Sequence, residues 1–587
     1  MLPIYSPATP SATSLGTYHK PWRIHKHFWS RRWPVLACFL AVFVLVWLLE
    51  PYRFPLPFYS DHDDELVPLE PVPAPPSKNI PRPLADISEV VKEKTWEGRK
   101  EQVRKAYLHA LEGYKQHAFP DDELLALSGG KSNKFNGWSV TLLDSMDTMW
   151  MMGLHDEFRD AVRVVAAQNF TLVNQQTAPF FETVIRYLGG LLSSYALSGE
   201  PILLARADDL GRMLLPVFDA NPSGLPAYGV NTKTGETSYG WMGSLILFSE
   251  ATSCQLEYKY LAKLTGRKEY YIAVDHIMEH MYRANVPNGL FPLTWSREGH
   301  PRDKHYSVGA SADSGYEYLL KQYLLSGDTK SRAQYLMSID GIITNLLYLT
   351  PTRHLLYVTD MNYKTPTHNL EHLSCFLPGV LALGAYTLEL PEKTRTLHQR
   401  AAEGLAYTCY TTYADTTTGL GPDGVYMVRG ESWVEALEKW EHDGAKGVVP
   451  GLEEFGVRVA GERDYRVSGS AYLLRPETIE SMFMLWKTTG DVKWRERGYE
   501  IFLAIERVAK TKYGYASVDR VDDEVPRQID DMPSYFLAET LKYLYLLFDD
   551  TDAYPIGKWV YNTEAHPLPV FEWTEWERKA YGIEDAA

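Results

Sequence analysis

The chain has 587 residues, of which 45% are hydrophobic and 13% aromatic, and its formal net charge is −16. This length and composition are sufficient for a large hydrophobic core. The acidic excess is spread along the chain and leaves no basic patch, so no nucleic-acid partner is expected.

The N-terminal part of the chain predicts a membrane anchor. Residues 1–32 are polar and basic, whereas residues 33–49, WPVLACFLAVFVLVWLL, contain no charged side chain. This run is at the short end for a membrane-spanning helix. A signal peptide is the alternative, but no small-residue cleavage site follows. The positive-inside rule places residues 1–32 in the cytosol and the remainder in the lumen. The Pro-rich residues 50–95 predict a stem without a packed core.

From residue 96 onward, apolar side chains recur with helical periodicity. The predicted helices form seven hairpins, each an outer helix followed by an inner one: 96–115 with 139–153, 156–168 with 178–197, 201–218 with 241–264, 267–283 with 311–326, 328–346 with 368–389, 391–414 with 470–489, and 492–507 with 532–548. One hairpin cannot bury a core alone, so neighbouring hairpins must complete it. The sequence therefore predicts an all-α domain over residues 96–587, interrupted by a charged surface insertion at 428–468.

Acidic side chains recur near the starts of the inner helices. In Leu473–Asp491, Pro476 suits the first helical turn and Gly490 suits the left-handed residue that closes a helix. Glu477 and Glu480 stand between them, in the first turn. A capped helix whose early acids interact with the helix dipole is one interpretation.

The recurrence favours a shared site instead. Glu250, Asp313 and His372 follow Glu182 at successive intervals of about 60 residues, as expected for one helix hairpin per repeat, and Glu539 follows Glu477 at a similar interval. If the helices form a ring, these side chains converge on one pocket. The polar segment 561–573, YNTEAHPLPVFEW, follows the last helix. It is either an ordinary tail or a plug that inserts into the ring and supplies oxygen ligands to a cation.

Ordered motifs from about Arg99 to Trp573 resemble the class I α1,2-mannosidases, family 47 of the glycoside hydrolases. They include LLDSMDTMWMMGL, FFETVIRYLGGLLSSY, GASADSGYEYLLKQ, HLSCFLPG, LLRPETIESMF, SYFLAETLKYLYLLF and NTEAHPLP. The resemblance implies an (α/α)7 barrel, which agrees with the seven hairpins. It also implies a type II membrane protein of the endoplasmic reticulum or Golgi that trims high-mannose N-glycans.

The resemblance implies the site residues one by one. Glu182 matches the general acid of an inverting glycosidase, and the general base is drawn from Asp313 and Glu477, with Glu477 favoured. Thr563 matches the threonine whose carbonyl and hydroxyl oxygens bind Ca²⁺. Positions lining the substrate subsite or surrounding the metal are matched by Arg186, Glu250, His372, Arg475, Tyr535, Glu539 and Glu564.

Composition alone does not pair the four cysteines, Cys38, Cys254, Cys375 and Cys409. The resemblance implies a disulfide between Cys375 and Cys409.

Two positions depart from the family pattern. Ser311 stands where the endoplasmic-reticulum members carry Arg, which affects the expected preference among glycan branches. Tyr535 stands where Phe is usual, so an aromatic ring is retained.

Two other functions compete with glycan trimming. One is a glycan-recognition factor in glycoprotein quality control with little catalysis, and release of free mannose distinguishes it. The other is a helical-barrel hydrolase of starch-like glucans, which leaves the NTEAHPLP motif unexplained.

Overall fold

A computed structural model describes residues 95–284 and 286–583 of the chain. The predicted cytosolic tail, the anchor at 33–49 and the stem up to residue 94 lie outside the described residues. Within the described ranges, no helix has the length and apolar character needed to cross a membrane.

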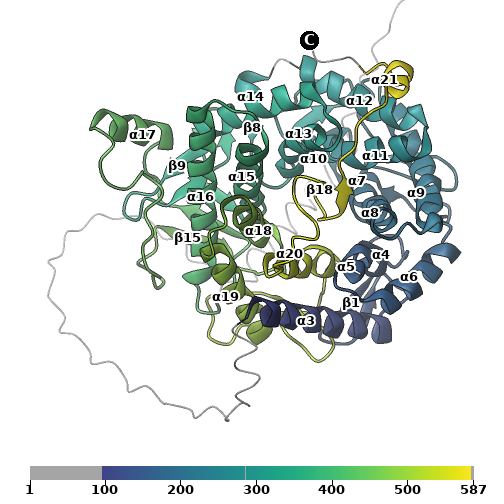
Figure 1. The fold of residues 1–587 in the computed structure, drawn as a ribbon, viewed down its shortest axis with the longest axis horizontal. Helices are drawn as coiled ribbons and strands as arrows, with labels where there is room; N and C mark the ends of the chain where they lie inside the picture. Colours follow the sequence, from purple (N-terminus) through teal and green to yellow (C-terminus); the bar gives the residue numbers. More distant parts are fainter. Residues whose placement is uncertain (1–94, 285, 584–587) are drawn as a thin grey trace, which may run out of the picture. The chain divides into compact units, whose positions relative to one another are not determined.

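The helices are arranged in two concentric layers that form a ring (Figure 1). The outer layer consists of α3 (Trp96–His117), α6 (His155–Ala167), α9 (Pro201–Leu214), α12 (Lys268–Arg283), α14 (Thr329–Leu346), α16 (Glu392–Ala414) and α19 (Lys493–Val508). These helices are amphipathic: α6, for example, buries Phe158, Ala161 and Val165 and exposes charged side chains on its other face.

The inner layer is built from more thoroughly buried helices. It consists of α4 (Val140–Asp144) with α5 (Met146–Met151), α7 (Phe180–Glu182) continuing through a π-helical turn (Thr183–Leu188) into α8 (Gly189–Ser198), α10 (Phe248–Thr252) with α11 (Gln255–Thr265), α13 (Asp313–Ser326), a 3-10 turn (His372–Phe376) with α15 (Leu377–Thr387), α18 (Glu477–Thr489), and a second π-helical turn (Phe536–Thr540) with α20 (Leu541–Leu547). Successive inner helices contact one another, and the last π-helical turn contacts α4 and α5, which closes the ring.

Each of the seven predicted hairpins therefore has a counterpart, and the all-α barrel is confirmed. Helix α18 begins at Glu477, directly after Pro476, and ends before Gly490, whose φ is 68°. Two predicted inner helices are interrupted. Residues 139–153 form two short helices, and the helix expected over 241–264 breaks between Thr252 and Gln255.

Short antiparallel strands, which the all-α prediction did not include, connect the helices. They form the pairs β1 (Glu123–Leu125) with β2 (Gly130–Ser132), β6 (Leu245–Leu247) with β7 (Thr294–Ser296), β9 (Leu347–Leu349) with β10 (Leu356–Val358), β16 (Ser517–Val518) with β17 (Gln528–Ile529), and β18 (Trp559–Tyr561) with β19 (Pro567–Pro569). Strands of two to five residues are too short to show an alternating pattern, so hydrophobic periodicity does not predict them.

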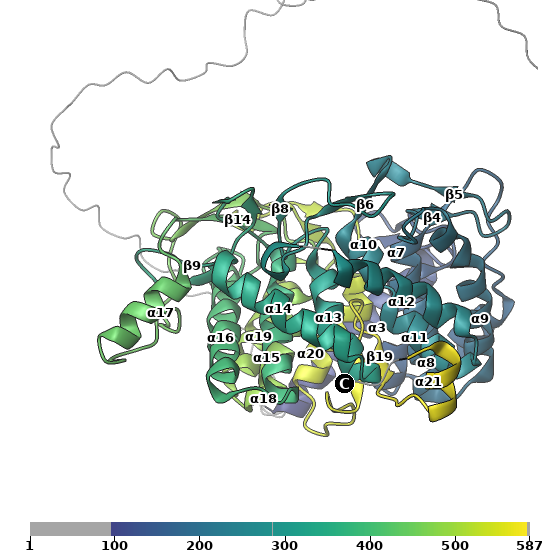
Figure 2. The same cartoon turned by 90° about the horizontal axis from the view of Figure 1, so that it is seen from above.

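Three further sheets have three strands each. Their orders are β3 (Ala178–Pro179), β4 (Gly229–Val230), β5 (Thr237–Ser238); β12 (Thr365–Pro366), β11 (Met361–Asn362), β8 (His305–Tyr306); and β13 (Asn369–Glu371), β14 (Gly424–Met427), β15 (Tyr465–Gly469). Figure 2 shows β4, β5, β6, β8 and β14 along one rim of the helical ring. The remaining elements are three 3-10 turns (Leu215–Asp219, Gly240–Met242, Pro287–Gly289), α17 (Trp433–His442), which lies in the segment 428–468, and α21 (Glu575–Tyr581).

The β18–β19 hairpin enters the ring and contacts α13 and α8 (Figure 1). His566, in the loop that joins the two strands, is fully buried between two aspartates, with Nδ1 2.8 Å from Asp147 and Nε2 3.1 Å from Asp144. Lys542 completes the group, because its ammonium donates to Asp147 and to the carbonyl of Ala565. The C-terminal segment is therefore a plug anchored by buried charges.

Candidate active site

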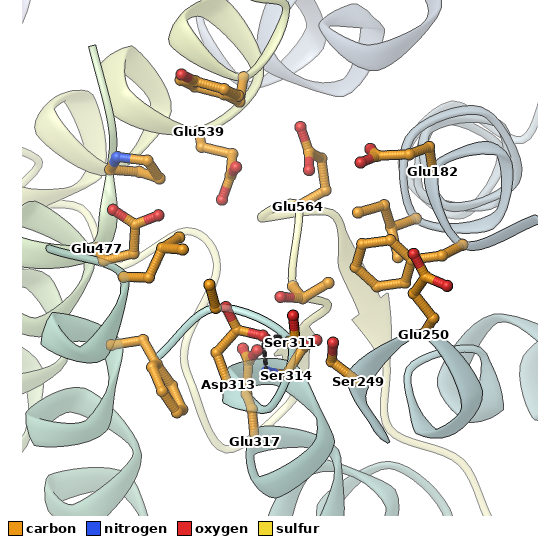
Figure 3. Close-up of a pocket in the computed structure, with 18 of the residues that line it drawn as sticks. Glu182, Ser249, Glu250, Ser311, Asp313, Ser314, Glu317, Glu477, Glu539 and Glu564 are labelled. Atoms are coloured by element: carbon orange, nitrogen blue, oxygen red, sulfur yellow. Dashed lines mark hydrogen bonds between the residues drawn. The ribbon is translucent and has the colours of Figure 1, made fainter. Parts of the chain in front are cut away.

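The starts of the inner helices and the tip of the plug surround one pocket of about 340 Å³. Its walls carry an unusual number of carboxylates, contributed by α7, α10, α13, α18, the last π-helical turn and the β18–β19 hairpin: Glu182, Glu250, Asp313, Glu317, Glu477, Glu480, Glu539 and Glu564 (Figure 3). The convergence expected from the spacing of the acids is therefore observed.

Arg186 links one wall of the pocket to the plug. Its Nε donates to Glu182 at 2.7 Å, and its Nη1 donates to Glu564 and, at 3.2 Å, to Ser534. Asp144 lies 3.6 Å from the same nitrogen. Burial opposes the charge of Arg186, but these carboxylates outweigh burial and raise its pKa well above the ordinary value. Glu182 is thus held in place by a permanently charged side chain.

Glu477 stands on the other wall and is backed by His372. Nδ1 of His372 lies 2.7 Å from Oε2 of Glu477, and Nε2 lies 2.5 Å from the Tyr413 hydroxyl. Burial by itself raises the pKa of Glu477, but the hydrogen bond to His372, the charge of that ring and the charge of Arg475 hold the pKa below its ordinary value. Arg475 lines the pocket and donates to Asp423 at 2.7 Å. His372 itself does not line the pocket; it positions Glu477 from behind.

Two other carboxyls in the pocket have pKa values that are raised instead of lowered. Burial raises the pKa of Asp313 to about 7, although the Ser314 backbone N–H donates to it at 2.8 Å. Burial, followed by the negative charge of Glu182, raises the pKa of Glu250 to about 7. The pocket therefore holds one carboxyl whose pKa is lowered and two whose pKa values are raised to about 7, a separation that suits acid–base chemistry.

Thr563 lies at the tip of the plug and lines the floor of the pocket. Its backbone N–H donates to Tyr318 at 3.4 Å, whereas its carbonyl and hydroxyl oxygens have no hydrogen-bond partner among the described residues. Burial raises the pKa of Glu539 well above its ordinary value, and the charges of Glu564 and Glu477 raise it further. Free oxygens beside crowded carboxylates are a donor set that suits a hard cation such as Ca²⁺. In residues 95–284 and 286–583, no group of three or more His, Cys, Asp or Glu side chains is arranged to hold a metal by itself.

Two pocket carboxylates were not assigned a role from the sequence. Glu317 pairs with the buried Lys321, which lies 3.8 Å from Glu480. Burial raises the pKa of Glu480 to about 8, despite the opposing charge of Lys321. Glu317 stands four residues after Asp313 and Glu480 three residues after Glu477, so helical spacing places each of them beside a residue that was assigned a role.

The backbone is left-handed at two residues that precede site residues. Ser311, with φ 72°, comes two residues before Asp313, and Leu474, with φ 63°, comes just before Arg475. Non-glycine residues rarely adopt this conformation, and it persists where surrounding packing imposes it. Ser311 itself lines the pocket (Figure 3).

Tyr535 also lines the pocket. Its hydroxyl donates to the carbonyl of Leu473 at 2.6 Å, and its ring centroid lies 5.8 Å from the Arg186 guanidinium. The extra hydroxyl, relative to Phe, is thus used to tie the last π-helical turn to the segment before α18.

Cys375 and Cys409 form a disulfide that joins the start of the fifth inner helix to α16. Cys254 is buried as a free thiol. The expected pairing is therefore observed.

A closed barrel of paired helices thus surrounds a pocket that is lined by carboxyls of divergent pKa. The family profile of Glycosyl hydrolase family 47 matches residues 106–570, and the chain belongs to this family.

Its relatives include mannosyl-oligosaccharide α-1,2-mannosidase IA of Drosophila melanogaster, which is 35% identical over 486 residues, 81% of this chain and 68% of the relative. Mannosyl-oligosaccharide 1,2-α-mannosidase IC of Homo sapiens is 35% identical over 80% of this chain and 70% of its own length. The human endoplasmic reticulum mannosyl-oligosaccharide 1,2-α-mannosidase is 36% identical over 81% of this chain and 64% of its own length.

Among solved structures, the α-1,2-mannosidase from Trichoderma reesei superposes with a TM-score of 0.72 at 29% identity, covering 81% of this chain and 99% of that one.

Proposed function

We propose that this enzyme is a calcium-dependent inverting exo-glycosidase that removes α1,2-linked mannose from high-mannose N-glycans of glycoproteins in the secretory pathway. The observation that carries the proposal is the pairing of Glu182 with Arg186 and of Glu477 with His372. Glu182 and Glu477 lie on opposite sides of the pocket (Figure 3). The names of the relatives supply the linkage and the sugar.

In this proposal, the two carboxyls act on opposite faces of the terminal sugar. Glu477 is ionised and accepts a proton from a water molecule as the water oxygen bonds to the anomeric carbon. Glu182, in its protonated form, donates its proton to the glycosidic oxygen as the bond to the remaining glycan breaks. The products are free mannose of inverted configuration and a glycan shorter by one residue.

Arg186 has a part in this cycle because it holds Glu182 by a charged hydrogen bond. It fixes the position of that carboxyl while the positive charge remains in place. The pKa values of Asp313 and Glu250 are raised to about 7, so near neutral pH a large fraction of each is protonated and can donate hydrogen bonds to sugar oxygens. We assign the base role to Glu477 over Asp313, because the base must be ionised before it accepts a proton.

We also propose that the pocket binds one Ca²⁺ ion. The carbonyl and hydroxyl oxygens of Thr563 would hold the ion, with Glu539 and Glu564 holding its water ligands. When bound, Ca²⁺ supplies a template for sugar hydroxyls and no redox chemistry.

We also propose the cellular location of the enzyme. Relatives that are named as endoplasmic reticulum enzymes support a place in the secretory pathway. The apolar run 33–49 then anchors a single-pass type II protein in the membrane of the endoplasmic reticulum or Golgi, with the barrel in the lumen.

The test is a time course of the purified full-length chain on a nine-mannose N-glycan, with free mannose and the product isomers resolved. The expected result is that mannose is released stepwise and that the product isomers appear in a defined order. A chain that binds the glycan but releases no mannose, under conditions in which a related mannosidase is active, would instead be a glycan-recognition factor.

A further inference from the structure

Residues 169–171, Asn-Phe-Thr, form an acceptor motif for N-linked glycans in the connection between α6 and β3. They are the one Asn-x-Ser/Thr sequence of the chain in which the middle residue is not proline; residues 221–223 read Asn-Pro-Ser. No residue of the acceptor motif lines the active-site pocket. The proposed hydrolysis therefore does not account for it.

The side chain that would receive a sugar is accessible. Asn169 and Thr171 are both exposed. Oδ1 of Asn169 accepts from the backbone N–H of Thr171 at 3.0 Å, and the Thr171 hydroxyl lies 3.4 Å from the Asn169 carbonyl oxygen. Nδ2 of Asn169, the atom that bonds to the sugar, has no hydrogen-bond partner among the described residues. The folded domain therefore leaves room for a glycan that is already attached.

The middle residue of the acceptor motif is in the opposite situation. Phe170 is 0% exposed, and its ring centroid lies 5.4 Å from that of Trp138 and 6.5 Å from that of Tyr187, edge-on to both. Its φ of 51° is a left-handed value that non-glycine residues seldom adopt. Packing thus holds the acceptor motif in one compact conformation, with its centre in the hydrophobic core.

The connection between β4 and β5 closes over the same segment. The Thr232 hydroxyl donates to the Phe170 carbonyl at 2.5 Å, and its oxygen accepts from the Leu172 backbone N–H at 3.1 Å. Asn231 donates to the Val173 carbonyl at 2.9 Å. These partners lie about 60 residues later in the sequence, so the acceptor motif takes up its final conformation only after the β4–β5 connection has been synthesised and has docked.

This arrangement restricts when the motif can be read. An enzyme that recognises Asn and Thr two residues apart must bring both side chains, and the backbone between them, into one active site. In the folded domain it would first have to lift Phe170 out of the core and break the contacts with Thr232, which requires local unfolding. In the unfolded chain the same three residues are accessible without that cost.

We propose that Asn169 carries an N-linked glycan and that the glycan is added before this part of the domain folds. In the transfer, Nδ2 bonds to the anomeric carbon of the first sugar as the bond from that carbon to a lipid-linked diphosphate breaks. Nδ2 loses one proton, and the lipid diphosphate leaves. The inference rests on the lumenal location in the proposed function, because N-glycosylation belongs to the secretory pathway.

The first experiment determines whether the site is used. Full-length chains are expressed in eukaryotic cells and treated with an amidase that removes N-glycans and converts the glycosylated Asn to Asp, which mass spectrometry detects. Wild type and Thr171→Ser are expected to show the conversion at Asn169, and Thr171→Ala is expected to lose it. Because Thr171 is exposed, all three chains should have the same melting temperature.

A second acceptor motif separates this inference from the location of the enzyme. Lys364→Thr creates a motif at Asn362, whose middle residue, Tyr363, has a similar φ of 59° but is 68% exposed. Glycosylation of Asn362 without glycosylation of Asn169 would overturn the proposal and leave the lumenal location intact. If neither site is glycosylated, both the site and the location are wrong.

The last experiment determines the order of glycosylation and folding. Full-length Lys364→Thr is produced in cells in which synthesis of the lipid-linked donor is blocked, and is then incubated with oligosaccharyltransferase and donor. The chain is used either folded, or unfolded with its cysteines reduced and alkylated. Transfer to Asn169 is expected to be at least about 10-fold lower in the folded chain, because it then requires local opening. Asn362 should be modified in both. Equal transfer to Asn169 in the two samples would overturn the proposed order.

Discussion

His372 and Glu477 are in direct contact across two inner helices, with Nδ1 of the imidazole 2.7 Å from Oε2 of the carboxylate, although they are 105 residues apart in the sequence. The other ring nitrogen lies 2.5 Å from the Tyr413 hydroxyl, so the imidazole is held from both sides. The pair provides an ionised carboxylate at a buried position, where burial alone would favour its protonated form.

Replacing His372 with Ala is expected to shift the acidic limb of the kcat/KM profile to higher pH. The pKa of Glu477 lies below its ordinary value because of this hydrogen bond and the charge of Arg475. Without the imidazole, burial dominates and the pKa rises, so the ionised base is lost at a higher pH as the solution is acidified. Tyr413→Phe, which leaves the contact with Glu477 intact, is expected to produce a smaller shift. An unchanged acidic limb in His372→Ala would show that Glu477 is not the base.

Glu182→Gln and Glu477→Gln are each expected to reduce mannose release by about 10²- to 10⁴-fold, the usual contribution of a general acid or base. Both changes keep the side-chain volume, so the melting temperature should change little. Glu435→Gln, on the exposed face of α17, serves as the control and should retain full activity. Near-normal turnover by either pocket variant would disprove the role assigned to that residue.

Removal of calcium with a chelator is expected to lower both activity and melting temperature. A ligand that binds only the folded state stabilises it by mass action, and few direct protein ligands make the ion removable. Ca²⁺ should restore both properties, whereas Mg²⁺ should do so poorly because it requires a tighter octahedral arrangement. Full activity in a verified calcium-free sample would mean that Thr563 belongs only to the plug.

His566→Ala is expected to lower the free energy of unfolding by about 3–5 kcal/mol, because it leaves buried aspartates without one of their partners. His354→Ala breaks a surface contact with Glu453 of 3.2 Å and is the control, with an expected loss of about 0–1 kcal/mol. Both are measured by urea denaturation. Similar losses in the two variants would show that the buried group does not anchor the plug.

The same group predicts a pH window for stability. Lys542 and His566 overcome the effect of burial and lower the pKa of Asp147 to about 2, so its contribution is present above the ordinary value of about 3.9 and is lost as pH falls toward 2. The pKa of His566 is raised by Asp147 and Asp144 against the effect of burial. Its contribution is present below about pH 6.5 and is lost as pH rises through the folded-state pKa. The difference in stability between wild type and His566→Ala should therefore be largest between about pH 4 and 6.5.

A truncated chain that begins at Lys94 is expected to be soluble and as active as the full chain, because the Pro-rich residues 50–95 predict a stem between anchor and barrel. Activity and sedimentation of both chains in the absence of detergent provide the measurement. An insoluble or inactive truncated chain, alongside an active full chain, would contradict this division.

The sequence by itself determined where the helices lie and which helix ends carry acidic side chains. Helical periodicity and end signals are local, so Pro476 and Gly490 marked α18 without knowledge of its neighbours. The regular spacing of Glu182, Glu250 and Asp313 indicated equivalent places in successive hairpins, and ring closure then required them to meet.

Only the tertiary structure decided the surroundings of each acidic side chain and therefore its pKa. Glu477 and Asp313 occupy equivalent helix starts, yet one is ionised by His372 and Arg475 while burial protects the proton of the other. Such differences arise from partners that are distant in the chain and from the loss of solvent, neither of which has a local pattern in the sequence.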